Sequence, residues 1–100
     1  MNTFGELIRT KREQQDMLLR HLSASLDMDM ALLSKIERGE RFARIEQVIR
    51  IAEILKIDIQ ELKSIWLADK IVDMATKEDN GLEILDLAIK KVNTIIKNKQ

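Results

Sequence analysis

Residues 32–41 read LLSKIERGER, and this stretch decides the fold. Leu33 and Ile36 fall on one helical face, which predicts a short helix with its apolar side turned inward. Asp29 is a suitable N-cap for this helix, because its carboxylate can accept a hydrogen bond from an unpaired amide of the first turn. Gly39 stands where a C-capping glycine belongs. The pattern therefore predicts a helix from Asp29 to about Arg38.

A second short helix is predicted immediately before this one. Its apolar face consists of Leu18, Leu19, Leu22 and Leu26. The residues Asp27 to Asp29 read as a tight turn, with Met28 pointing inward between the two acids. Two short helices joined by a turn of three or four residues are typical of a helix-turn-helix.

Helices are also predicted on both sides of this pair. Phe4, Leu7 and Ile8 mark a first helix, roughly Thr3 to Gln15. A fourth helix has one apolar face made of Ile45, Val48, Ile49, Ala52 and Leu55. Two capping-box patterns, Asp58 with Glu61 and Asn80 with Glu83, open a fifth helix that runs to about Ala75 and a last helix. We expect an all-α fold.

The composition agrees with helices and limits the function. The chain has 100 residues, 45% of them hydrophobic and 34% charged, with three glycines and no proline. This length suits one compact domain plus an appendage, and we place the domain at residues 1–67 and a helical extension at residues 68–100. The absence of cysteine excludes disulfides, zinc knuckles and thiol catalysis. No apolar run reaches the roughly 18 residues of a membrane span, and we expect a cytoplasmic protein.

Positive charge is concentrated locally. The whole chain has 17 basic and 17 acidic residues and is formally neutral. Between Lys35 and Arg44, however, there are four cations and two anions in ten residues. A local patch of this kind can bind phosphate although the chain as a whole is not basic.

The stretch LLSKIERGER resembles the end of the recognition helix in the Cro/C1-type, or XRE, family of transcriptional regulators. FGELIRTKRE (4–13) resembles the first helix of that family, and VIRIAEILKIDIQEL (48–62) resembles its fourth helix and the start of its fifth. The resemblance covers roughly Thr3 to Leu67. It implies a five-helix, lambda-repressor-like domain that binds double-stranded DNA, and a regulator, most simply a repressor, that acts as a homodimer on a near-palindromic operator.

The resemblance also implies roles for individual residues. The positions that would face base edges are Met30, Ala31, Ser34 and Lys35. The positions that would contact phosphates are Leu19, through its backbone amide, and Arg20, Arg38, Arg41 and Arg44. Lys35 can donate to guanine O6 and N7, whereas Met30 and Ala31 offer apolar contact only. Each of these side chains could instead be an ordinary surface residue, and the apolar ones could pack against another protein.

The sequence departs from the family pattern in three places. Leu18 and Leu19 replace a small polar cap and a phosphate-binding glutamine, Asp27 replaces a glycine of the turn, and Ser23 replaces an alanine packed beneath it. The family pattern further implies an ion pair between Arg12 and Glu37, which would hold the first helix against the recognition helix.

The last helix is too apolar for a lone appendage. One stripe contains Leu85, Ala88, Ile89, Val92, Ile95 and Ile96. Because the five-helix domain closes its own core, we expect this stripe to form a dimer interface. The alternative is that the last helix folds back on its own domain and leaves a monomer.

DNA binding is not the only function that this fold can carry. A protein–protein interaction module on the same fold, such as an antitoxin or adaptor, is the main alternative. His21 is the only histidine, and Asp27 and Asp29 are better explained by turn and cap chemistry than by catalysis. We therefore expect no enzyme activity, no metal, no cofactor, no small-molecule ligand and no membrane partner.

Overall fold

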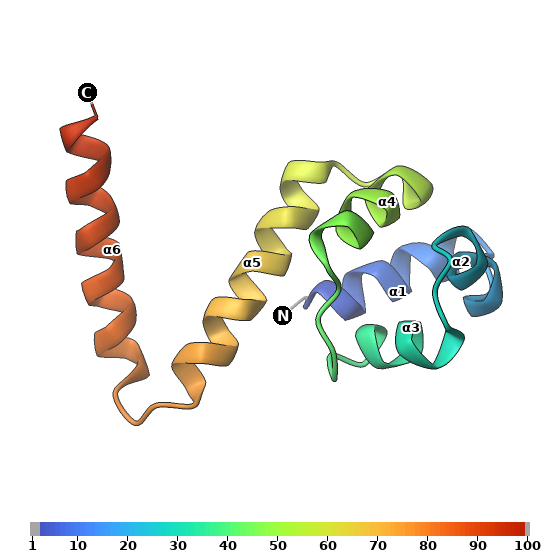
Figure 1. The fold of residues 1–100 in the computed structure, drawn as a ribbon, viewed down its shortest axis with the longest axis horizontal. Helices are drawn as coiled ribbons and strands as arrows, with labels where there is room; N and C mark the ends of the chain where they lie inside the picture. The colour runs from blue at the N-terminus through green and yellow to red at the C-terminus, as the bar shows by residue number, and fades with distance from the viewer. Residues whose placement is uncertain (1–2, 100) are drawn as a thin grey trace. The chain divides into compact units, whose positions relative to one another are not determined.

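A computed structural model describes residues 3–99, and every regular element within that range is a helix. The helices are α1 (Phe4–Gln14), α2 (Leu19–Ser25), α3 (Met30–Glu37), α4 (Ile45–Leu55), α5 (Ile59–Thr76) and α6 (Gly81–Asn98) (Figure 1). The all-α prediction is confirmed. The chain divides into two compact units, Met1–Asp69 and Lys70–Gln100, and α5 continues from the first into the second.

The first unit surrounds one apolar core. Each of the helices α1 to α5 directs a stripe of aliphatic residues inward, as the helical spacing predicts. The fully buried side chains are Ile8, Leu22, Leu33, Ile36, Val48, Ile51, Leu55 and Leu62. Met28 in the turn between α2 and α3 is also buried, as its position between two acids predicts.

The chain reverses at residues with unusual backbone angles. Asp16 and Asp27, which follow α1 and α2, have φ values of 53° and 51°, and Gly39, which follows α3, has a φ of 78°. Aspartate adopts this left-handed region more readily than most non-glycine residues, which explains how Asp27 replaces the usual turn glycine. At the start of α3, the amide of Ala31 donates to Asp29 Oδ1 at 2.7 Å, so the predicted N-cap is present.

The beginning of α5 ties the first unit together. The indole Nε1 of Trp66 donates to the carbonyl oxygen of Ala43 at 2.8 Å, in a buried contact. The amide of Phe4, at the start of α1, donates to Asp69 Oδ2 at 2.8 Å. Because Asp69 caps α1, the compact unit extends slightly beyond Leu67, where the sequence analysis ended the domain.

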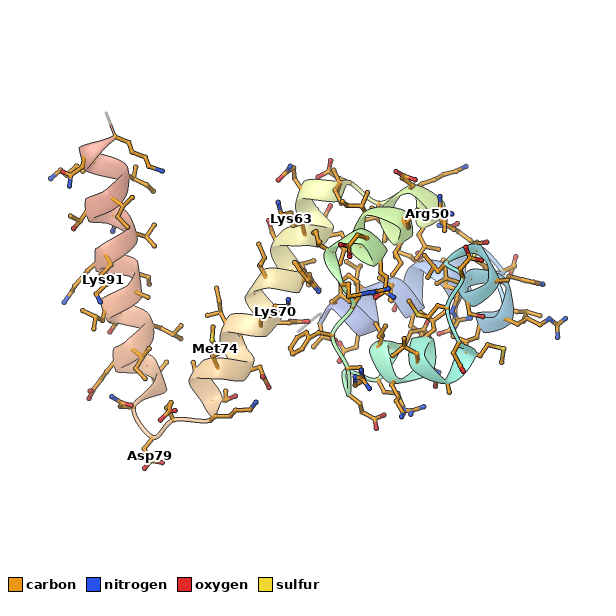
Figure 2. All side chains as sticks on the ribbon, in the orientation of Figure 1. Arg50, Lys63, Lys70, Met74, Asp79 and Lys91 are labelled. Carbon is orange, nitrogen blue, oxygen red and sulfur yellow. The ribbon has the colours of Figure 1, made fainter. Side chains whose placement is uncertain are left out.

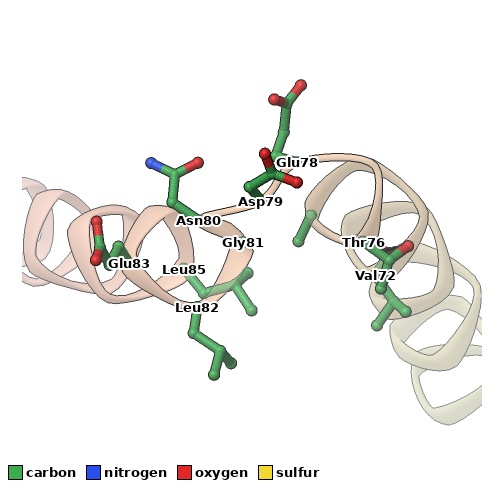
Figure 3. Close-up of a pocket in the computed structure, with 10 residues that line it drawn as sticks. Val72, Thr76, Glu78, Asp79, Asn80, Gly81, Leu82, Glu83 and Leu85 are labelled. Carbon is green, nitrogen blue, oxygen red and sulfur yellow. Dashed lines mark hydrogen bonds between the residues drawn. The ribbon is translucent and has the colours of Figure 1, made fainter.

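The second unit contains the end of α5, a short turn and α6. At the turn, Gly81 approaches Ala75 so closely that a Cβ on Gly81 would lie 2.3 Å from the Ala75 carbonyl oxygen. A groove of about 490 Å³ lies beside this contact, lined by residues from Val72 to Leu85 (Figure 3). The capping box predicted for α6 is wrong in one respect, because the Asn80 side chain makes no capping hydrogen bond. α6 buries none of its residues.

Candidate DNA interface

The helix-turn-helix consists of α2, the turn at Leu26–Asp29, and α3. α3 buries Leu33, Ile36 and Glu37 on one side, which fixes the direction of its other side. Met28 anchors the turn from below, and Ser23 lies buried in α2, where it donates from Oγ to the Arg20 carbonyl oxygen at 3.1 Å. The outer face of α3 is therefore held by the core of the domain, as direct readout of a groove requires.

The residues predicted to face bases lie on this outer side of α3. Met30 is 48% exposed, and Ala31 and Lys35 are exposed as well. Ser34 is half-buried, and its Oγ accepts a hydrogen bond from Arg38 Nη1 at 2.5 Å. Three of the four predicted positions are thus open to a ligand, while Ser34 is engaged by a neighbouring arginine.

Exposed cations lie on the elements directly before and after α3. Arg20 lies on α2, and Arg41 and Arg44 lie in the loop between α3 and α4; all are exposed. Among residues 3–99, none of these three arginines has an ion-pair partner. Arg38 differs, because its guanidinium pairs with Glu40 in an exposed contact that costs little to break.

A buried ion pair fixes α3 to α1. Arg12 Nε donates to Glu37 Oε2 at 2.9 Å, and Arg12 Nη2 donates to Glu37 Oε1 at 3.0 Å. Arg12 Nη1 also donates to the Met17 carbonyl oxygen at 2.9 Å, which brings in the segment before α2. The two side chains are only 11% and 5% exposed. This two-pronged geometry suits the planar guanidinium and holds the helices in one register.

The charge on Arg12 is stabilised by its surroundings. The hydrogen bond to Glu37 raises the pKa of Arg12, against the opposing effect of burial, and the charges of Glu37 and Glu13 raise it further. A group whose pKa is higher in the folded state than in the unfolded state stabilises the fold fully below its unfolded-state pKa. This stabilisation is lost as the pH rises through its folded-state pKa. Deprotonation of Arg12 therefore removes none of this contribution at neutral or moderately alkaline pH.

A comparison with protein families identifies the family of this chain. The model of a helix-turn-helix family matches residues 8–62, which include α2, the turn and α3. The chain belongs to the Cro/C1-type helix-turn-helix (XRE) family. It is a DNA-binding helix-turn-helix regulator, and the family is not an enzyme family. No curated protein and no solved structure matches the chain.

None of the described helices is long and apolar enough to cross a membrane. Between Thr3 and Lys99, histidine and acidic side chains nowhere gather in a group of three or more that could hold a metal ion.

The start of α2 departs from the XRE pattern in a way the structure describes. Leu19, which stands at the position of the usual glutamine, packs partly against the core and leaves only its backbone amide for a phosphate. Leu18 is the N-cap residue, and its amide donates to His21 Nδ1 at 3.3 Å. His21 thus supports the first turn of α2 in place of a polar cap.

Sequence reasoning missed several residues that position this XRE domain. Trp66 holds Ala43, which lies between the cations Arg41 and Arg44. Arg50 Nη2 donates to the Ser25 carbonyl oxygen at 2.9 Å and so closes the end of α2. These contacts join residues far apart in the chain, and the only available signal was that Trp66 is the sole tryptophan.

Gly5 was also missed. A Cβ on Gly5 would lie 2.4 Å from the carbonyl oxygen of Ile36 and 2.5 Å from that of Glu37. Only glycine allows α1 to approach the end of α3 this closely. The close approach also brings α1 near enough for Arg12 to reach Glu37.

Proposed function

We propose that this XRE regulator is a repressor that binds a near-palindromic operator as a homodimer. Each copy inserts α3 into the major groove, where the base pairs present distinct patterns of donors and acceptors. Met30, Ala31, Ser34 and Lys35 face the bases, with Lys35 reading guanine. The observation that carries this proposal is the exposed outer face of α3, with the buried Arg12–Glu37 pair fixing the helix and exposed arginines on the elements before and after it.

The phosphate contacts are proposed on both sides of that groove. Arg20 and the Leu19 amide reach one strand from α2, and Arg38, Arg41 and Arg44 reach the other from the end of α3 and the loop after it. These contacts position the protein, and the contacts of α3 specify the sequence. Arg38 exchanges Glu40 for a phosphate when DNA binds.

The dimer is proposed to form through α6. The interface residues are Leu85, Ala88, Ile89, Val92, Ile95 and Ile96. Leu85 is half-buried and the others are exposed, several of them by more than half, as for Ile89 at 58% and Ile95 at 55%. The operator proposed for such a dimer has two half-sites whose centres lie roughly 34 Å apart, one turn of DNA.

Selection of binding sites from random duplexes, followed by titration of the selected site over a salt series, tests this function. We expect a near-palindromic site and dimer stoichiometry. The affinity should fall steeply as the salt concentration rises, because releasing counterions from the DNA is then less favourable. Placing the selected site between a promoter and a reporter should lower expression. Weak, sequence-independent binding would contradict the proposal.

One observation favours a second function, a protein-interaction module. Met30 is 48% exposed and Phe42 is 46% exposed, so apolar side chains lie among the cations of the proposed interface. If this surface binds protein, Met30→Lys should leave DNA affinity equal or stronger. If it lies against bases, the same change should alter the selected sequence.

A further inference from the structure

We propose that α6 of one copy lies antiparallel along α6 of a second copy, with its acidic first half against the basic second half of the partner. This inference rests on the proposed homodimer and adds its orientation. The partner is a second copy of this chain, and the observation that selects it is the distribution of charge along α6.

The apolar face of α6 has the spacing of a helix-pairing surface. Its central positions alternate three and four residues apart, and they are Leu82, Leu85, Ile89, Val92 and Ile96. This alternation is the repeat by which two helices interlock along their length. Ile71 of α5 lines an apolar groove of about 350 Å³ together with Leu85 and Val92, which widens the surface. Such a face supplies the affinity but does not fix a direction.

The charges of α6 are divided between its two halves. The charged residues in the first half of α6 are the acids Glu83 and Asp86, and the acids Glu78 and Asp79 precede the helix in the turn. The charged residues in its second half are the bases Lys90, Lys91 and Lys97, and Lys99 is the C-cap residue. In Figure 2, Asp79 marks the acidic end and Lys91 the basic half.

This division selects the antiparallel direction. Parallel helices would place acid beside acid and base beside base, which is unfavourable over several turns. Antiparallel helices place each acidic half beside a basic half, and they also oppose the two helix dipoles.

The contacts along one edge of the helix give the register. Asp86, Lys90, Asn93 and Lys97 are spaced four, three and four residues apart, so they form one row beside the apolar face. In an antiparallel pair this row faces the same row of the partner in reverse. Asp86 then lies level with the partner's Ile95, just past the partner's Asn93 and between the partner's Lys90 and the partner's Lys97. The same register places Leu85 opposite the partner's Ile96 and Ile89 opposite the partner's Val92.

Disulfide mapping in the full chain tests the direction, because the chain has no cysteine of its own. Leu85→Cys and Ile96→Cys variants, carrying different tags, are oxidised separately and after mixing. In the antiparallel pair Leu85 and the partner's Leu85 are displaced by eleven residues, about 16 Å along the axis. A disulfide needs Cα atoms within about 7 Å. We expect a crosslink only in the mixture.

Every other outcome overturns the inference. Crosslinks within each variant alone would show parallel helices. A dimer without any crosslink would show that α6 is not the contact, and light scattering of a monomer would show that α6 folds back on its own chain. Sequence-specific DNA binding is measured separately on the same samples, so the proposed regulator can stand when this orientation fails.

Charge reversal gives a second measurement that does not disturb the apolar face. Asp86→Lys places a cation between two lysines of the partner, twice per dimer, and should weaken dimerisation about tenfold. The triple variant Asp86→Lys, Lys90→Glu, Lys97→Glu should restore dimerisation, because it exchanges the two signs. Glu53→Lys, at an exposed site of α4, is the matched control and should have no effect. Unchanged dimerisation in Asp86→Lys would contradict the antiparallel row.

Discussion

α3 and α6 both have an exposed face, but the molecule holds the two helices in different ways. α3 has 8 residues and buries three of them, with Glu37 locked to Arg12. α6 has 18 residues and buries none. A helix that reads a rigid duplex benefits from being fixed before the encounter. A helix whose stripe of aliphatic residues is exposed instead gains most of its stabilisation when a partner covers it.

Removing α6 should have the largest effect, because it leaves α3 in place without the exposed apolar helix. A chain that ends at Thr76 keeps α5 whole and all the contacts of the first unit. We expect it to remain folded, to become mainly monomeric, and to lose about 10²–10⁴-fold in operator affinity, because the second half-site is no longer tethered. Light scattering, circular dichroism and gel shift measure the three properties. Full operator affinity in this shortened chain would show that α6 has no role in DNA binding.

The second largest effect should come from breaking the Arg12–Glu37 ion pair, which fixes α3 to α1. Glu37→Gln leaves the buried Arg12 charge without its partner, so we expect a loss of about 3 kcal/mol in the free energy of unfolding. The matched control is Glu13→Gln, because Glu13 pairs with Arg9 at side chains 56–59% exposed, and this change should cost less than about 1 kcal/mol. Urea denaturation followed by circular dichroism measures both. Equal losses would show that burial of the pair does not matter.

The outer face of α3 can be separated from the loop beside it. Lys35→Ala should relax the preference at one base pair and cost about 1–3 kcal/mol on the operator alone. Arg41→Ala should weaken binding to every sequence and reduce the salt slope by about one. Titrations of specific and random duplexes over a salt series distinguish the two. The same loss on both duplexes for both variants would remove the distinction between reading and positioning.

A substitution of Trp66 tests how firmly the loop between α3 and α4 is held, because the indole donates to the Ala43 carbonyl oxygen in that loop. Trp66→Phe keeps an aromatic ring in the core but leaves the Ala43 carbonyl oxygen without its donor. We expect a loss of about 1–2 kcal/mol in the free energy of unfolding and weaker binding to all DNA sequences. Circular dichroism must be the probe, because the variant has no tryptophan fluorescence. Stability equal to that of the parent chain would show that water replaces the indole.

The smallest predicted effect lies in the turn. Asp27 has a φ of 51°, so Asp27→Gly should relieve strain and stabilise the first unit by about 0.5–1 kcal/mol. Ala24→Gly, at an exposed helical position of α2, should do the opposite by a similar amount. Thermal unfolding of the two variants gives the sign. Destabilisation by Asp27→Gly would mean that the Asp27 side chain makes a contribution larger than the strain.

Local signals in the sequence predicted the helices well. The periodicity of apolar residues gave the order of the helices, and Asp29 and Gly39 gave the ends of α3. These signals act over a few residues, so they can be seen without the fold. The Asn80 cap failed because its backbone angles, φ −107° and ψ 36°, differ from the extended conformation of a side-chain cap.

Long-range contacts could not be predicted from spacing. Trp66 with Ala43, Asp69 with Phe4, and Arg50 with Ser25 each join different elements. A polar residue reveals its partner only when the packing brings the two together. The site residues of α3 were expected from a family pattern, and that pattern gave no indication that Ser34 is occupied by Arg38.

The contacts that α5 makes within the first unit, through Leu62, Trp66 and Asp69, limit which changes in length this part of the helix can accept. Each helical residue adds about 1.5 Å along the axis and about 100° of rotation around it. One residue inserted within α5 would therefore rotate all later side chains by about 100° relative to the earlier ones. Substitutions on the exposed side of α5 leave that phase unchanged. The turn between Thr76 and Gly81 is not helical, so a change in its length rotates no helical face. It is constrained by the close contact of Gly81 with Ala75. Aligned relatives that retain the C-terminal helix should therefore place their gaps in this turn and not between Ile59 and Asp69.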